Sequence, residues 1–194
     1  MEHEILLTGI GGQGVQLAAR ILAQAATLEG REVMSLGTYG GTMRGGSTDA
    51  TIVVADQRIV SPPIVAEAGS ALAMHHAFWS PVAAKLRAGA VVVLNSTVFD
   101  QPLERTDLKL FEVPATRLAN ELGNTMAASL VLLGAWTALR GFVSLESLLA
   151  AMEAAVPSYR SQHIESNAAA LRCGYDALPA NTAPAWPSAE RVRA

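Results

Sequence analysis

The chain has 194 residues and a formal net charge of −3, with 51% hydrophobic and only 16% charged residues. This length suits one domain with a full core. The small, dispersed charge excludes nucleic acid as a main partner. No apolar run reaches the roughly 18 residues that a membrane span needs, because residues such as Glu121 and Arg140 interrupt it. This apolar composition predicts that much of the protein surface contacts other chains.

The cysteine and histidine content argues against a metal or redox centre on this chain. Cys173 is the single cysteine, so no internal disulfide is possible, and one thiolate alone holds neither an iron–sulfur cluster nor a structural zinc. His75 and His76 follow a strand and would point to opposite faces, so no metal site is expected there. The acidic start, residues 1–4, lacks the positive region of a secretory signal and predicts a cytoplasmic protein.

The first elements are predicted to be a strand, a glycine loop and a helix. Ile5–Leu7 is apolar and strand-like, residues 9–14 read Gly-Ile-Gly-Gly-Gln-Gly, and Val15–Leu28 has helical character. Val33–Leu36 reads as a second strand, which completes a β-α-β unit. The glycine-rich segment 37–46 has no apolar periodicity, so we expect an exposed loop.

Strands and helices alternate along the middle of the chain, and helices follow. Pro81 is expected to start a helix that runs to about Arg87. Further strands are predicted at 48–55, 71–74, 90–94 and 109–113. Further helices are predicted at 115–122, 125–139, 145–156 and 161–178. We therefore expect an α/β fold, with a three-layer Rossmann-like sheet that is mostly parallel and a helical C-terminal third.

The domain organisation is expected to be simple. Residues 1–178 are predicted to form a single α/β domain, and residues 179–194 an extended or disordered tail, because this tail contains three prolines and scattered charges. Trp186 adds the alternative that the tail lies over a partner.

The glycine loop is the first candidate site. Residues 9–14 fit the Gly-x-Gly-x-x-Gly pattern, and the following helix would point its free N–H groups at an anion in the loop. The carboxylate that holds the ribose of a dinucleotide is missing, because Gly37 and Thr38 stand at the end of the second strand. The glycines could alternatively serve only close packing of the helix on the sheet. Gly12 and Gln13 favour a ligand-facing loop, since a steric turn needs neither.

A second candidate site is the loop around Arg44. It follows Tyr39 and precedes Gly45 and Gly46. A guanidinium on such a flexible backbone suits a phosphate, a carboxylate or an acidic residue of a partner. A solvated arginine on a surface loop is the alternative.

Several short segments, taken in order, carry a resemblance to a known family. They are Gly9-Ile-Gly-Gly-Gln-Gly-Val15, Tyr39-Gly40 leading to Met43-Arg44-Gly45-Gly46, Leu122-Gly123-Asn124, Leu133-Gly134-Ala135, and Asn167 with Ala170-Leu171 and Gly174-Tyr175. From Ile5 to Leu178 the chain resembles the gamma subunit, or gamma domain, of the 2-oxoacid:ferredoxin (acceptor) oxidoreductase family, of the pyruvate, 2-oxoglutarate and indolepyruvate type. It departs from the family pattern at Gly41-Thr42, where a proline and an acidic residue are common, and at Ser129, where an asparagine is expected.

The resemblance implies a non-catalytic subunit of a larger enzyme. Alpha and beta subunits, with a ferredoxin-like one, are expected to bind thiamine diphosphate, Mg and iron–sulfur clusters and to decarboxylate a 2-oxoacid. The gamma subunit is expected to help assemble this hetero-oligomer, to cover its active site and to contact coenzyme A. No catalytic or metal-binding residue is expected on this chain. The positions expected to face a ligand are Gly9, Gly11, Gly12, Gln13, Gly14, Tyr39, Arg44, Gly45 and Gly46.

Two other functions stay open at this point. A stand-alone Rossmann-like oxidoreductase would bind a nucleotide with the first glycine loop. A purely structural scaffold subunit would use both loops to contact protein only.

Overall fold

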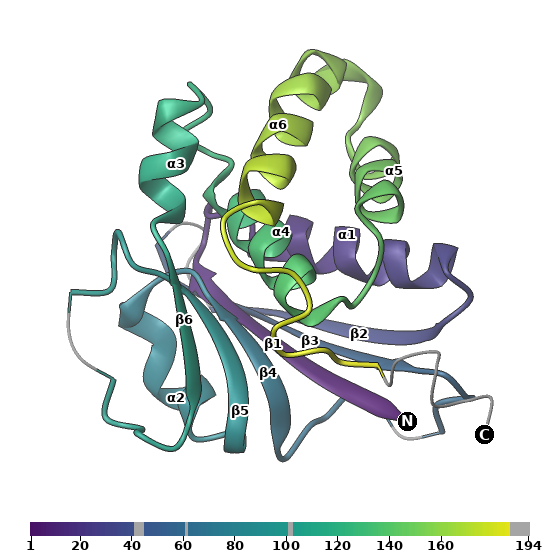
Figure 1. The fold of residues 1–194 in the computed structure, drawn as a ribbon, viewed down its shortest axis with the longest axis vertical. Coiled ribbons are helices and arrows are strands. Elements are labelled where there is room, and N and C mark those ends of the chain that lie inside the picture. The colour runs from purple at the N-terminus through teal and green to yellow at the C-terminus, as the bar shows by residue number, and fades with distance from the viewer. Residues whose placement is uncertain (41–44, 61, 101–102, 187–194) are drawn as a thin grey trace.

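A computed structural model describes residues 1–40, 45–60, 62–100 and 103–186 of the chain. The strands of this described part are β1 (Glu2–Ile10), β2 (Glu32–Tyr39), β3 (Ser47–Ala55), β4 (Ala68–Ala73), β5 (Leu86–Asn95) and β6 (Lys109–Val113). They form one sheet in the order β2-β3-β1-β4-β5-β6 (Figure 1). The pairs β1–β4, β4–β5 and β5–β6 are parallel, whereas β3 lies antiparallel between β1 and β2.

The helices cover the two faces of the sheet unequally. They are α1 (Val15–Leu28), α2 (Trp79–Ala83), α3 (Ala115–Glu121), α4 (Ala128–Arg140), α5 (Leu145–Ala155) and α6 (Ile164–Tyr175), with short 3-10 segments η1 (His76–Phe78) and η2 (Ser158–His163). Figure 1 shows α1 and α4 on one face, with α5 and α6 packed over them, and α2 on the other face. The structure confirms an α/β fold with a mostly parallel sheet and a helical C-terminal third, and the layer beyond the sheet contains one short helix.

The core follows from the alternation of side chains along the central strands. Ile5 and Leu7 of β1 belong to the large cluster that includes α1 and α4, and Leu6 belongs to a second cluster with Trp79 and Val82 on the α2 side. Because both faces of β1, β4 and β5 are covered, these strands read as continuous apolar runs, as parallel strands usually do.

Two glycines bring α4 and α6 close together. A Cβ added at Gly134 would overlap the carbonyl oxygen of Leu171, and one added at Gly174 would overlap the carbonyl oxygen of Val131. Most of α4 is buried on every side. Trp136 on this helix donates its indole N–H to Ser70 Oγ on β4 at 2.6 Å, which ties α4 to the sheet.

Residues 37–39 differ from the prediction of a loop over residues 37–46, of which 41–44 lie outside the described residues. β2 continues to Tyr39, which pairs with Thr48, so residues 37–39 belong to a hairpin with β3. Because Gly37 has no side chain, the Gln16 side chain can occupy the space where a Cβ at position 37 would lie. The predicted β-α-β unit is therefore interrupted, since β3 separates β2 from β1.

Three helix boundaries also differ from the prediction. The helix around Pro81 is α2, which ends at Ala83, and Leu86 is already in β5. Proline fits the first turn of α2, where its missing N–H has no partner to lose. α4 begins at Ala128 because Asn124–Ala127 form a turn after Gly123, whose φ is +70°. The last helix begins at Ile164, after η2.

Residues 179–186 lie against this chain itself. Three N–H groups of the segment donate to the last carbonyls of α4: Asn181 to Ala138, Ala183 to Leu139 and Ala185 to Arg140. The indole N–H of Trp186 donates to the Phe142 carbonyl at 2.8 Å, and the Arg31 guanidinium lies 3.9 Å from the centre of its ring. These contacts hold the segment to the C-terminal end of α4 and to the start of β2.

Candidate ligand-binding site

The glycine loop connects β1 to α1 at the carboxyl end of β1. Gly12 and Gly14 have φ of +106° and +80°, values that favour glycine. A Cβ at Gly9 would lie 2.8 to 2.9 Å from Gln13, Met74 and Val15, so the loop is closely packed there. The Gln13 side-chain oxygen accepts the Ile10 N–H at 2.8 Å. This part of the Gln13 amide therefore closes the loop instead of facing a ligand.

The two glycine-rich segments meet, as their places in the sequence suggested. The Gly11 N–H donates to the Gly46 carbonyl at 2.8 Å, and Gly45 has a φ of +78°. Tyr39 ends β2 at the same edge, where the Gly40 N–H bonds to the Ser47 carbonyl. Arg44 lies outside the described residues, together with 41–43. The predicted positions are thus brought together, apart from Arg44, on which the structure gives no information.

The first turn of α1 is open toward this loop. Gly14 is the N-cap and provides no side-chain hydrogen bond, and the first helical bond is from Ala18 N–H to its carbonyl at 2.9 Å. The N–H groups of residues 15–17 therefore have no partner within the helix. Such a helix start attracts anions, because the free N–H groups and the helix dipole both favour negative charge.

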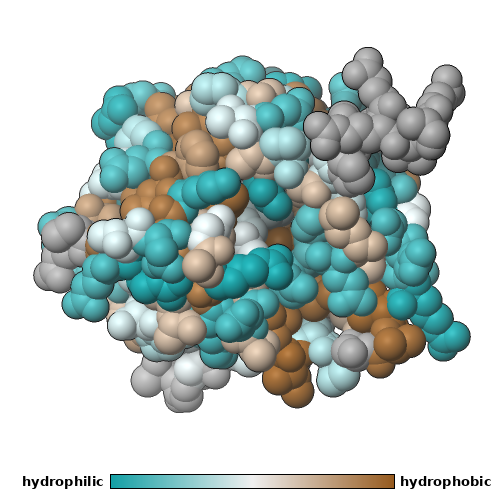
Figure 2. All heavy atoms as spheres, turned by 60° about the horizontal axis from the view of Figure 1, so that its bottom comes forward, coloured by the Kyte–Doolittle hydropathy of each residue, from teal (hydrophilic) through white to brown (hydrophobic). Residues whose placement is uncertain are grey.

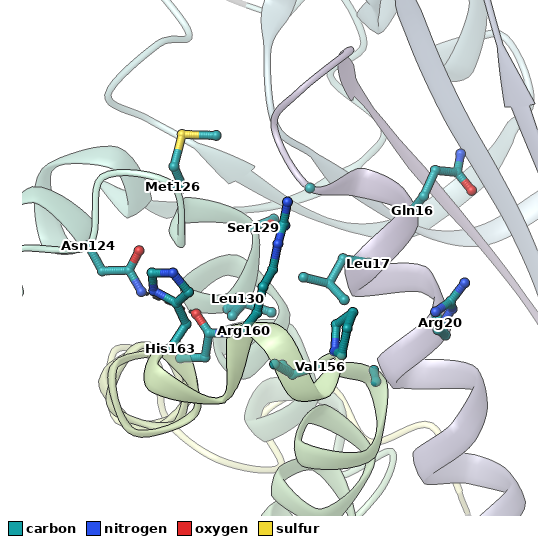
Figure 3. A pocket seen from close by; sticks show the side chains of 14 residues that line it. Gln16, Leu17, Arg20, Asn124, Met126, Ser129, Leu130, Val156, Arg160 and His163 are labelled. Atoms are coloured by element: carbon teal, nitrogen blue, oxygen red, sulfur yellow. Dashed lines mark hydrogen bonds between the residues drawn. The ribbon is translucent and has the colours of Figure 1, made fainter.

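A cavity of about 480 Å³ adjoins the start of α1 on the side of the later helices (Figure 3). It is bounded by the first two turns of α1, the start of α4, and the segment from the end of α5 into α6. The described residues that line it include no Asp or Glu and are Gly14, Gln16, Leu17, Arg20, Asn124, Met126, Ser129, Leu130, Ala155, Val156, Pro157, Arg160, His163 and Asn167. Its volume lies in the range of ordinary small-molecule sites.

Sequence reasoning missed this cavity. Its residues come from three separate helical regions, and only Gly14, Asn124 and Asn167 were among the segments that suggested the family. The structure explains the two asparagines: Asn124 Nδ2 donates to Asn167 Oδ1 and to Ser166 Oγ, each at 3.2 Å. The two asparagines thus join the turn before α4 to α6. Their spacing in the sequence gives no signal for Arg160 or His163.

Titratable groups elsewhere give little sign of catalysis. Burial raises the pKa of the Cys173 thiol, with nearby Asp176 and Glu121 acting in the same direction, so the reactive thiolate is disfavoured. Burial lowers the pKa of His75. Within the described ranges no three His, Cys, Asp or Glu side chains are grouped to hold a metal ion. Those ranges also contain no helix long and apolar enough to cross a membrane.

These features define an α/β domain whose two glycine-rich segments meet beside an open helix start. The family model described as pyruvate ferredoxin/flavodoxin oxidoreductase matches residues 4–177. The chain belongs to this family, as a gamma-type subunit.

Relatives of known name agree on this type of subunit. The 2-oxoglutarate synthase subunit KorC of Methanothermobacter thermautotrophicus is 33% identical over 163 residues, which cover 81% of this chain and 86% of that protein. The common gamma subunit of the pyruvate/ketoisovalerate oxidoreductases of Thermococcus litoralis is 29% identical and covers 89% of this chain and 95% of its own length. These relatives are thus similar over almost the whole domain.

Solved structures agree as well. The gamma subunit of a keto/oxoacid ferredoxin oxidoreductase from Geobacter sulfurreducens has a TM-score of 0.79 and 26% identity, covering 91% of this chain and 96% of that one. The 2-oxoglutarate:ferredoxin oxidoreductase of Magnetococcus marinus, solved with 2-oxoglutarate, coenzyme A and succinyl-CoA, has a TM-score of 0.81 at 18% identity. This chain corresponds to 30% of that protein, and the likeness is one of fold.

Proposed function

We propose that the chain is the non-catalytic gamma subunit of a cytoplasmic, thiamine-diphosphate-dependent 2-oxoacid:acceptor oxidoreductase. Alpha and beta subunits, with a ferredoxin-like one, would carry the thiamine diphosphate, the Mg and the iron–sulfur clusters. The names of the relatives support a complex of this kind. The lone Cys173, whose pKa is raised by burial, suits a chain that supports the reaction without carrying electrons.

The meeting of the two glycine loops carries the proposal that this subunit contacts coenzyme A. The Gly11–Gly46 hydrogen bond holds both loops at the start of α1, where unpaired N–H groups suit a phosphate. A backbone without side chains lets a bulky ligand approach closely. The described residues of the site therefore fit the phosphates of coenzyme A, and the sequence adds Arg44 as an expected further donor, which lies outside the described residues.

A substitution at Gly11 tests the contact with coenzyme A. Its added Cβ would lie 3.4 Å from Thr48 Oγ1, so Gly11→Ala should fold while obstructing the mouth of the loop. In the assembled enzyme we expect KM for coenzyme A to rise about ten-fold, because the added methyl group would keep the ligand from approaching the loop closely. KM for the 2-oxoacid should stay the same. Gly30→Ala, in a turn at the far end of α1, is the control, and an unchanged KM for coenzyme A in Gly11→Ala would contradict the proposal.

A groove on the α2 side of the sheet, lined by apolar side chains together with Asp49 and Lys85, supports the assembly role. Leu36, Pro63, Ile64 and Val65 line it together, and Ile64 is 78% exposed. The space-filling view shows that hydrophobic side chains reach the surface of the molecule in several patches (Figure 2). Such exposed apolar side chains are typical of contacts between subunits.

Co-purification tests the assembly role directly. The tagged wild-type chain should retain the cofactor-bearing subunits, and Ile64→Glu should reduce the amount retained, because it would bury a charge in the interface. Val156→Thr, on the opposite side of the molecule, provides a control of modest polarity. If the isolated chain were monomeric and active on a 2-oxoacid without partners, the proposal would fail.

Two other functions are less well supported. A stand-alone dinucleotide enzyme needs an acidic residue at the end of a second strand next to the first, but β3 separates β2 from β1 here. Calorimetry with NAD, NADP, FAD and coenzyme A would reveal tight dinucleotide binding if it existed. For a scaffold that contacts only protein, Arg44→Ala would weaken assembly and leave the affinity of the assembled enzyme for coenzyme A unchanged.

A further inference from the structure

The two edges of the sheet differ in how they are protected against pairing with another strand. Figure 1 shows β2 at one margin of the sheet and β6 at the other. β6 has five residues and exposes the charged residues Lys109 and Glu112, which discourage pairing. β2 has eight residues, and its single charged side chain is at its first residue, Glu32. It contains no proline and pairs with β3 in one continuous register. β2 therefore lacks the usual features that prevent a further strand from joining an edge.

The free edge of β2 presents backbone groups at alternate residues. The Gly40 N–H donates to the Ser47 carbonyl at 2.7 Å, and this pair continues the β2–β3 register. In an antiparallel pair such hydrogen-bonded positions recur at every second residue. The N–H and C=O groups of Val33, Ser35 and Gly37 therefore point away from β3. Within the described part of the chain β2 pairs with β3 alone, so these groups are available to a strand of another molecule.

The neighbouring helix leaves this edge open. A groove of about 490 Å³ runs between α1 and β2, and the exposed residues Ser35 and Gly37 lie in it. On the other side of the groove α1 contributes Ala19 and Ala23, whose side chains are too short to cover the strand. Among the described lining residues only Arg20 is charged, and its long side chain can turn to solvent. The groove therefore leaves space for a second strand beside β2.

The side chains of β2 complement those of a second β2 strand. Met34 and Leu36 lie on the α2 face, where Leu36 is 43% exposed. Directly opposite residues of an antiparallel pair face the same side, so a two-fold axis through Ser35 would put Met34 of each copy opposite Leu36 of the other. An axis through Met34 would put Leu36 opposite Glu32, and an axis through Leu36 would put Met34 opposite Thr38. Only the axis through Ser35 gives both apolar side chains an apolar neighbour, and it opposes no like charges.

We propose that β2 pairs antiparallel with β2 of a second copy of this chain, which joins the two sheets across a two-fold axis at Ser35. The Ser35 N–H of each copy would donate to the Ser35 carbonyl of the other, and Val33 would pair in the same way with Gly37. A two-fold interface needs a surface that complements itself, as this edge does. The inference goes beyond the proposed function, because it concerns a contact between two copies of this chain and rests on neither coenzyme A nor the other subunits.

Cross-linking of the full-length chain tests the register. In a Cys173→Ser background, Ser35→Cys would place two thiols opposite each other with their Cα atoms about 5.5 Å apart, within the reach of a disulfide. Thr38→Cys is the matched control, because its two thiols would lie about 20 Å apart along the paired strands. Mild oxidation should give a covalent dimer with Ser35→Cys and none with Thr38→Cys. No covalent dimer from Ser35→Cys, or equal amounts from both variants, would overturn the proposal.

Sedimentation over a range of concentrations tests the pairing itself, and the wild type should be a dimer. Ser35→Pro removes the N–H that faces the second copy and keeps the hydrogen bonds to β3, and proline is tolerated at such positions of edge strands. It should weaken the dimer at least about thirty-fold, because two hydrogen bonds are lost. Ser35→Lys should also weaken the dimer, since two lysines would meet at the axis, whereas Ser35→Thr, which keeps the N–H and adds no charge, should stay dimeric. A monomeric wild type, or a dimer that neither Ser35→Pro nor Ser35→Lys weakens, would overturn the proposal.

Two further comparisons separate this contact from others. Leu110→Lys adds the same charge to an exposed position of the other edge strand and should leave the dimer intact. Dissociation by Leu110→Lys alone would place the contact on β6 and overturn the proposal. A dimeric chain that retains no cofactor-bearing subunit would support the pairing and contradict only the assembly role. A monomeric chain that retains those subunits would contradict only the pairing.

Discussion

At the scale of single residues, Gly14 connects the glycine loop, the first helix and the cavity. Its φ of +80° ends the loop and starts α1, and the space that a side chain would occupy is taken by the Ser129 hydroxyl. Alanine at this position would therefore be destabilising for two reasons: the strained backbone conformation and the overlap of its Cβ with Ser129.

Gly14→Ala tests this pair of constraints. Gly30 is the matched control, because it has a φ of +75° and no atom within 4 Å of an added Cβ. Gly30→Ala should cost about 1 kcal/mol from backbone strain alone, and Gly14→Ala should cost more. Adding Ser129→Ala to Gly14→Ala should recover part of the difference. The free energies of unfolding in urea measure this, and equal losses at the two glycines would show that Ser129 imposes no constraint.

Some residues of the candidate site could be predicted from the sequence, and others could not. The glycines between residues 9 and 14 could be predicted because their order, strand then loop then helix, is local. That Gln13 faces a ligand stays a prediction; what the sequence could not indicate is that its side-chain oxygen closes the loop by accepting the Ile10 N–H. Ser129, Arg160 and His163 come from distant segments, and neighbours along the chain carry no information about such a meeting. The cavity could therefore be found only from the three-dimensional structure.

At the scale of elements, the close contact between α4 and α6 sets the geometry of the cavity. Gly134 and Gly174 leave room for the backbone of the opposite helix. The cavity walls Ser129 and Asn167 stand on the same two helices. Separating the helices would therefore move both walls as well as reduce the core.

Gly174→Ala should reverse the usual effect of alanine in a helix. Helix propensity alone would stabilise the variant by about 1 kcal/mol, but its Cβ would overlap the Val131 carbonyl, and overpacking of this kind costs roughly 3 kcal/mol. Denaturant unfolding should therefore show a net loss of stability. Gly134→Ala provides the reciprocal test, because its Cβ meets the carbonyl of Leu171. A stabilised Gly174→Ala would show that the helices can separate at little cost.

The bounds of the elements were predicted well where the sequence signal was local, and less well where pairing between strands determines where a strand begins or ends. β6 has the predicted bounds, 109–113, because its apolar residues lie between turns. The extension of β2 to Tyr39 depends on pairing with Thr48, and the early start of β5 at Leu86 depends on pairing with Ala68. Glycines at 37 and 89 concealed both extensions, since glycine normally indicates a turn.

At the scale of the whole molecule, residues from both ends of the described chain meet at one place. The His3 ring on β1 lies 4.4 Å from the ring of Trp186 and 5.7 Å from that of Phe142, in edge-to-face contacts. The buried Nε2 of His3 has no hydrogen-bond partner among the described residues. From the sequence, Trp186 suggested only that the tail could lie over a partner. Its contact with the first strand results from the path of residues 179–186 over α4.

This meeting point should make stability depend on pH. Burial, followed by repulsion from Arg140 and Arg87, lowers the pKa of His3 from 6.5 to about 4. The unfolded chain therefore binds a proton at His3 that the folded chain excludes, so stability should fall as the pH drops from about 6.5 to about 4 and should not depend on His3 above that window. His3→Phe keeps an aromatic ring against Trp186 and has no proton to bind. Urea unfolding at pH 7.5 and pH 5 should show a smaller loss for His3→Phe than for the wild type, while His163→Gln, which changes an exposed histidine, should follow the wild type. If His3→Phe lost as much stability as the wild type, the charge of His3 would have no part in joining the two ends of the fold.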